Sequence, residues 1–209
     1  MINQLLTFPL YILKSPFKGF SDMKYDKTSG IKYAIMILII AGMARVFQVL
    51  YTGFILRGIH HDVRSINLIQ TLTMFYAPIL LFVIANWSIT TITNGKGTIT
   101  EILKTYAYAM YPMIFCRVIA TILSNVVTAE EAFFSAFFVA LGTFLTYAYL
   151  FVGLIVIHEY TFLKAILMVI LTILAMMLIV FVLALFASLL SNFVSFIFIF
   201  IQELEPHLT

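Results

Sequence analysis

The chain has 209 residues, of which 63% are hydrophobic and 10% are charged, and its formal net charge is +3. Soluble domains hold about half apolar and about a quarter charged residues, so this composition, with a mean hydropathy of +1.10, excludes water as the main solvent. We therefore expect a protein that resides in a lipid bilayer.

The first segment, residues 1–30, holds a short apolar run that is interrupted by Pro9 and Pro16 and followed by lysines. A secretory signal has the opposite order, with positive charge before the apolar run and a small-residue cleavage site after it. Aromatic and lysine side chains alternate here in a way that suits the headgroup layer of a membrane. We expect an uncleaved cytoplasmic interfacial segment, and the alternative is a basic tail without fixed structure.

Five apolar stretches follow, each long enough to cross a hydrocarbon core of about 30 Å, which takes about 20 helical residues. Unpaired backbone amides are costly in lipid, and the alternating segments of a barrel are absent, so the stretches are expected to be helices. The predicted fold is an all-α membrane protein whose residues 31–187 form a five-helix transmembrane bundle. Pro78 and Pro112 are expected to kink two spans. The predicted spans are 31–50, 68–89, 102–126, 132–157 and 163–186.

The last apolar run, residues 165–201, is too long for one span, because a straight helix of this length would measure roughly 55 Å. Ser188, Ser191 and Asn192 interrupt the run and predict that the fifth span ends near them. We expect residues 188–209 to form an external apolar tail that lies along the outer interface or packs against the bundle. A re-entrant turn is the alternative.

Basic residues predict the orientation, because cytoplasmic loops retain positive charge during insertion. Only Arg57 and Arg64 lie on the side opposite the N-terminus. With five crossings, this asymmetry predicts a cytoplasmic N-terminus and an external C-terminus. The basic residues on the N-terminal side are Lys14, Lys18, Lys24, Lys27, Lys32, Lys96, Lys104 and Lys164.

Residues that could carry chemistry form no catalytic or metal-binding set. Cys116 is the single cysteine, so no thiol pair exists. His158 begins a His-Glu pair but lacks the second histidine, four residues later, of a zinc protease, and the glycines around Lys96 lack the spacing of a phosphate-binding loop. The histidines and aspartate of residues 60–62 are adjacent and cannot all converge on one ion, which favours a solvated loop. We expect no enzyme, no cofactor and no nucleic-acid partner.

Arg45 and Arg117 fall within the first and third predicted spans, roughly 10 Å from their outer ends. A charge at this depth is expensive, and no Asp or Glu lies within a span to pair with it. One hypothesis is an anion or lipid-headgroup site in the outer leaflet. The favoured interpretation is an interfacial anchor whose guanidinium group snorkels to the surface.

Gly142, Thr146, Tyr149 and Gly153 lie on one face of the fourth span, because their spacing is four, three and four residues. Small residues and hydroxyls let helices approach closely in lipid. This face therefore favours bundle packing or homo-oligomerisation over the lining of a pore.

The loop between the second and third spans is rich in glycine. Gly95 and Gly97 are expected to supply positive φ in a tight turn, and Thr98 or Thr100 to cap the third helix. The alternative is functional: Lys96 and the free amides bind a lipid phosphate or a partner's carboxylate.

Several motifs resemble the central signature of the Yip family of small integral membrane proteins, which are named for interacting with Ypt/Rab GTPases. The resemblance covers nearly the whole chain, and the last two motifs are similar to the prokaryotic branch. The motifs are Asn86-Trp87, Gly95-Lys96-Gly97-Thr98, Tyr106 to Pro112 with Tyr108, Leu123-Ser124-Asn125, Pro16 to Phe20 and His158-Glu159-Tyr160.

The resemblance implies five spans, a cytosolic N-terminus, no catalytic residue, and association with other membrane proteins such as ATP-driven sugar transporters. Eukaryotic members have a longer N-terminal region and act in vesicle traffic, whereas this chain has about thirty residues before the first span, which argues against a Rab-type partner. We expect a non-enzymatic scaffold or accessory subunit of a prokaryotic cell membrane that binds membrane proteins or itself, or shapes the bilayer. The alternative is a channel or transporter for a small solute or lipid.

Overall fold

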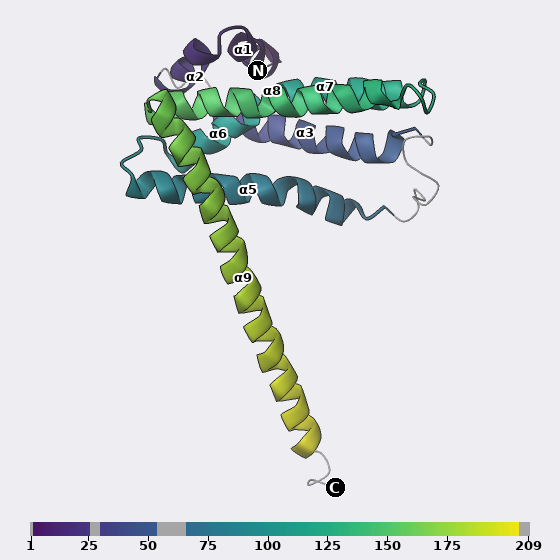
Figure 1. Ribbon diagram of the computed structural model, residues 1–209, viewed down its shortest axis with the longest axis vertical. Helices are drawn as coiled ribbons and strands as arrows, with labels where there is room; N and C mark the ends of the chain where they lie inside the picture. The colour runs from purple at the N-terminus through teal and green to yellow at the C-terminus, as the bar shows by residue number, and fades with distance from the viewer. Residues whose placement is uncertain (1, 26–29, 54–65, 205–209) are drawn as a thin grey trace.

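The computed structural model describes residues 2–25, 30–53 and 66–204 (Figure 1). Every regular element within these ranges is an α-helix, which confirms the predicted all-α class. Five stretches are long and apolar enough to cross a membrane, with α6 and α7 together forming one of them. The helices are α1 (Ile2–Lys14), α2 (Pro16–Tyr25), α3 (Ile31–Tyr51), α5 (Leu68–Ile92), α6 (Ile99–Ala109), α7 (Tyr111–Ser124), α8 (Ala132–His158) and α9 (Phe162–Leu204).

Four of the five candidate spans form a bundle. α3, α5, α8 and the α6–α7 pair run alongside one another (Figure 1). These spans contain 21 to 27 residues, or roughly 31 to 41 Å of helix, which suits a hydrocarbon core of about 30 Å. We call the end where α3 begins and α8 ends the proximal end, and the opposite end the distal end.

The third span is broken at Met110. Pro112 lies in the first turn of α7, where its missing N–H would have had no helical partner. The N–H of Met110 donates to the carbonyl oxygens of Tyr106 at 3.1 Å and Ala107 at 3.3 Å, which closes α6. The distortion predicted at Pro112 is therefore present as a break between two helices, whereas Pro78 lies inside the single helix α5.

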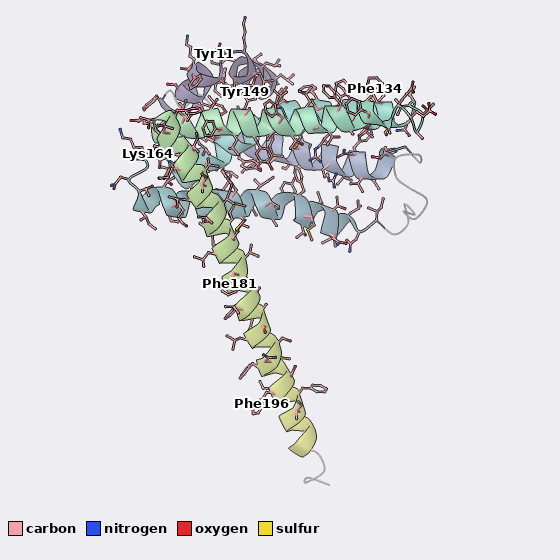
Figure 2. All side chains as sticks on the ribbon, in the orientation of Figure 1. Tyr11, Phe134, Tyr149, Lys164, Phe181 and Phe196 are labelled. Carbon is pink, nitrogen blue, oxygen red and sulfur yellow. The ribbon has the colours of Figure 1, made fainter. Side chains whose placement is uncertain are left out.

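The N-terminal helices α1 and α2 pack as a hairpin against the bundle, over α8 (Figure 2). Phe20 is fully buried, and the Tyr11 hydroxyl donates to Asp22 Oδ2 at 2.8 Å, which joins the two helices. The Tyr149 hydroxyl of α8 donates to the Leu13 carbonyl at 2.8 Å. The alternative of a tail without fixed structure is wrong for the described part of this segment, while its interfacial depth stays a prediction.

The small-residue face of α8 packs within the chain. A Cβ atom on Gly142 would lie 2.6 Å from Cys116 Cβ of α7, and one on Gly153 would overlap the Thr105 methyl of α6. Thr146 between them is buried. The two predicted roles of this face were bundle packing and homo-oligomerisation. In the structure the face packs inside the bundle.

The fifth span, α9, departs from the bundle. It starts at the proximal end, crosses α5 and then extends away as a single helix of 43 residues (Figure 1). Ala165, Met168 and Thr172 are buried, whereas every side chain of residues 180–199 is exposed. From residue 180 to residue 199, α9 therefore has no cover from the described part of its own chain.

The helix α9 does not end near Ser188, where the fifth span is predicted to end, but continues to Leu204. The Ser195 hydroxyl donates to the Ser191 carbonyl at 2.9 Å, so its hydrogen bond is made inside the helix and does not interrupt it. The described part of the predicted tail also does not pack against the bundle, because its side chains up to residue 199 are exposed. Its place in the membrane stays a prediction.

Candidate functional site

Segments distant in sequence meet at the proximal end around His158, the last residue of α8, which is only 2% exposed. The Gly97 N–H donates to His158 Nδ1 at 3.1 Å, so Nδ1 carries a lone pair and the proton is on Nε2. Nε2 then donates to Asn86 Oδ1 of α5 at 3.2 Å. The Asn86 amide donates in turn to Thr172 Oγ1 of α9 at 3.0 Å. One imidazole thus links α5, α8, α9 and the loop before α6.

Gly95 and Gly97 are required by close packing. A Cβ atom on Gly97 would lie 2.5 Å from His158 Cε1, and one on Gly95 would overlap the Tyr160 hydroxyl. Neither glycine has a positive φ, and the positive φ of this turn, 56°, belongs to Asn94. The expectation that the glycines supply positive φ is therefore wrong.

The other motif residues also have structural roles. Thr98 Oγ1 accepts from the Glu101 N–H at 3.3 Å, and Glu101 Oε2 accepts from the Thr98 N–H at 2.8 Å, so Thr98 is the cap of α6. The buried ring of Tyr108 lies edge-on to Phe8 of α1, with 5.3 Å between ring centroids. Trp87, by contrast, is exposed on the outer surface of α5.

Glu159 directly follows α8, and its carboxylate accepts hydrogen bonds from three side chains. Its Oε1 accepts from Lys24 Nζ at 2.8 Å and from the Tyr25 hydroxyl at 2.6 Å, and its Oε2 accepts from Lys96 Nζ at 2.5 Å. Hydrogen bonds from Lys24, Lys96 and Tyr25 lower the pKa of the Glu159 carboxyl to about 2. Burial disfavours the charge on Lys24, but its bonds to Glu159 and Tyr25 leave the Lys24 pKa raised overall.

Lys96, the predicted docking lysine, therefore already binds a carboxylate of its own chain. Sequence reasoning assigned no role to Glu159. The available signal was that this acidic residue lies in a connection on the same predicted side of the membrane as the N-terminus, where most of the lysines also lie.

The structure brings Arg45 and Arg117 together in the distal half of the bundle. Arg45 Nη1 and Arg117 Nη1 donate to the same atom, Gln48 Oε1, at 3.0 and 3.1 Å. The Arg117 guanidinium also lies 5.5 Å from the centre of the Phe75 ring. Neither arginine forms an ion pair within the described residues, and Arg117 Nε is buried without a hydrogen-bond partner there.

Gln48 is a site residue that sequence reasoning missed. The available signal was an amide three residues after Arg45 on the same face of an apolar span. Its amide oxygen has two lone pairs and satisfies one donor of each guanidinium. The interpretation of each arginine as an isolated anchor does not account for this shared contact.

Both arginines line a cavity of about 510 Å³ that also contacts Gln70 and Thr71 of α5. A second cavity, of about 520 Å³, has a mostly apolar lining from α5, α8 and α9. Pro78, Tyr106 and Tyr147 line both cavities, so the two spaces adjoin. A cationic cavity and an apolar cavity therefore lie next to each other, on either side of these three shared residues.

The structure thus separates the three candidate binding residues into two places. Lys96 lies at the proximal end with Glu159, and the arginines lie in the distal half with Gln48. Among the described residues, no group of three or more His, Cys, Asp or Glu side chains could hold a metal ion. The predicted solvated loop at residues 60–62 lies outside the described ranges.

Comparison with known families gives a match to the Yip1 domain over residues 10–184. The matched range extends from α1 into α9 and contains the His158 cluster and both arginines. Comparison with curated proteins and with solved structures gives no match.

Proposed function

The chain belongs to the Yip1 domain family of multi-pass membrane proteins, and from this premise we propose that it is a non-enzymatic scaffold or accessory subunit. In this role it binds other membrane proteins, such as an ATP-driven sugar transporter or a second copy, or shapes the bilayer. The observation that supports the proposal most strongly is the long part of α9, residues 180–199, whose side chains are not covered by the described part of the chain.

The length of α9 exceeds what an upright span needs. Its apolar part, Phe162–Ile199, has 38 residues and measures about 57 Å. Such a helix stays within a hydrocarbon core of about 30 Å only if it tilts by roughly 60°. A steep inclination of α9 to the bundle helices, as in Figure 1, agrees with this requirement.

A tilt of that size exceeds the range of about 0–40° that is typical of membrane helices, and tilt is set by packing against neighbouring helices. α9 has buried residues only near its start, from Ala165 to Thr172. Farther along, the exposed Phe181 projects from the helix away from the bundle (Figure 2). Helices of another membrane protein would supply the packing that the described part of this chain does not.

Photo-cross-linking in native membranes tests the proposal. A photoreactive amino acid replaces Phe193 of α9 or, as the matched control, Phe144 of α8; both phenylalanines are more than half exposed. We expect a cross-link from position 193 to one defined protein, and cross-links from position 144 to lipid alone. Lipid adducts alone at both positions would overturn the accessory role.

A second candidate function, a channel or transporter for a small solute or lipid, is favoured by the adjoining cavities next to Arg45 and Arg117. Vesicles that contain the purified protein and a fluorescent phosphatidic acid test it. Movement of the probe between leaflets that depends on the protein supports transport. An unchanged leaflet distribution excludes lipid transport, and a flux assay with inorganic phosphate then tests the solute form.

A further inference from the structure

We propose that the two adjoining cavities bind one membrane lipid with a phosphate in its headgroup. Arg45 and Arg117 bind the phosphate, and the apolar cavity takes an acyl chain. This inference goes beyond the scaffold role and does not depend on it.

Arg45 and Arg117 carry positive charge that no ion pair among the described residues compensates. Two guanidinium groups share the neutral oxygen of Gln48, and no carboxylate among the described residues neutralises them. Each guanidinium has five N–H donors, and the buried Nε of Arg117 has no acceptor there. An uncompensated cation is expensive in a medium of low dielectric constant. An anion with several oxygens is the missing partner, and phosphate fits the planar fork of arginine.

The depth of the two arginines in the bundle favours a phosphate that belongs to a lipid. Arg45 lies six residues before the end of α3, and Arg117 lies seven residues before the end of α7. Both are therefore roughly 9–11 Å along the helix axis from the distal end of the bundle. In a hydrocarbon core of about 30 Å this depth lies in the outer part of one leaflet, below the usual level of the headgroups. A lipid that enters the first cavity can bring its phosphate to the arginines while its chains point deeper.

The second cavity has the mostly apolar lining that an acyl chain requires. Leu150, Phe151 and Leu154 of α8 face Val169 and Ile173 of α9 across the second cavity. The volumes of about 510 and 520 Å³ each fall within the usual range for ligand pockets. Inorganic phosphate would use only the cationic end, whereas a lipid uses both.

The two ends contribute differently to binding. A chain that leaves the bilayer for an apolar cavity exchanges one apolar environment for another and gains little free energy. The affinity therefore depends mainly on the arginines, and selection among lipids depends on headgroup charge. The apolar cavity distinguishes a lipid from a free anion.

Native mass spectrometry of the full chain in detergent tests the site with phosphatidic acid, phosphatidylcholine and inorganic phosphate as probes. We expect phosphatidic acid to bind at least tenfold more tightly than phosphatidylcholine. The variants R45Q and R117Q should each weaken phosphatidic acid binding about tenfold, because each removes a charge-assisted hydrogen-bonding group. K18Q is the matched control: it removes one positive charge from an exposed residue of α2 and should bind like the original protein.

Thermal unfolding of each variant shows whether the fold is kept. Where a glutamine variant does not fold, R45K or R117K replaces it; lysine keeps the charge, loses the fork and should bind with intermediate affinity. Unchanged phosphatidic acid affinity in folded variants at both positions would overturn the proposal. Phosphate binding as tight as that of phosphatidic acid would also overturn it, since the site would then serve a free anion. Neither result bears on the cross-linking test of α9.

Discussion

At the residue scale, the His158 ring occupies the space that a side chain on Gly97 would need. We predict that Gly97→Ala lowers the free energy of unfolding by about 1–3 kcal/mol, the usual cost of overpacking. The new Cβ would lie 2.5 Å from His158 Cε1, and the ring cannot withdraw because it is bonded to Asn86. Thermal unfolding in detergent measures the effect.

Gly30→Ala is the control for this substitution, because its Cβ would meet only the Tyr33 ring at ordinary contact distances of 3.7 and 3.8 Å. It should lower the unfolding temperature less than Gly97→Ala does, because its expected cost is only that of alanine in place of glycine at the N-cap of α3. If Gly97→Ala and Gly30→Ala are equally stable, the close packing of the glycine on the histidine is not what the fold requires.

Glu159 should make the stability of the protein depend on pH. Its pKa is lowered from 4.5 to about 2 in the folded protein, so the unfolded chain takes up the proton first as pH falls. The stability from its bonds to Lys24, Lys96 and Tyr25 is complete above pH 4.5 and is lost as pH falls toward 2. The unfolding temperature of the original protein should therefore fall more steeply over this window than that of Glu159→Gln.

The comparison uses a nonionic detergent so that lipid phosphates do not titrate in the same range. All other residues are the same in the two proteins, so their contributions to the pH dependence cancel in the difference. Parallel curves for the two proteins would show that the Glu159 bonds do not contribute to stability.

At the element scale, the α1–α2 hairpin depends on Phe20, which is fully buried against α8. We predict that Phe20→Ala opens the hairpin and makes trypsin cleavage after Lys18 or Lys24 at least tenfold faster. Removing a buried phenylalanine ring costs about 3–5 kcal/mol in protein cores, and about a third to a half of that is enough for this change in rate.

Phe17→Ala is the matched control, since Phe17 lies on the same helix and is 59% exposed. Its cleavage rate should stay close to that of the original protein. Equal acceleration in both variants would mean that the hairpin is held by something other than the Phe20 contact.

The elements themselves could largely be predicted, because length and hydropathy act locally. The structure has helices over 31–51, 68–92 and 132–158, close to the predicted spans, and it breaks the third span next to Pro112. The path of α9 could not be predicted in this way. A serine such as Ser195 can end a helix, or it can stay inside the helix and donate its hydroxyl to the carbonyl one turn earlier, as it does here. The neighbouring residues in the sequence do not show which of the two occurs.

The candidate sites were predicted only in part, because they depend on contacts between distant residues. Arg45 and Arg117 stood out as charges in apolar spans, but their shared acceptor Gln48 appears only when α3 and α7 pack together. The reason for Gly97 likewise depends on His158, which lies sixty-one residues later. Sequence patterns predict which residues are unusual, and tertiary packing decides what each of them contacts.

At the scale of the whole molecule, charge is distributed unevenly along the bundle axis. Lys24, Lys96 and Lys164 gather at the proximal end, where the first two bind Glu159 and the third lies over Tyr160. Positive charge favours retention on the cytoplasmic side during insertion. We therefore propose that the proximal end, with the N-terminal hairpin, faces the cytoplasm.

Cysteine labelling in intact cells tests this orientation. In a Cys116→Ala background, Glu130→Cys places a thiol at the distal end and Thr100→Cys places one at the proximal end; both positions are exposed. A membrane-impermeant maleimide should label position 130 in intact cells and position 100 only after the membrane is permeabilised. The original protein, whose Cys116 is buried, should stay unlabelled. The reverse pattern would place the proximal end outside, and the phosphate proposed beside Arg45 would then come from the cytoplasmic leaflet.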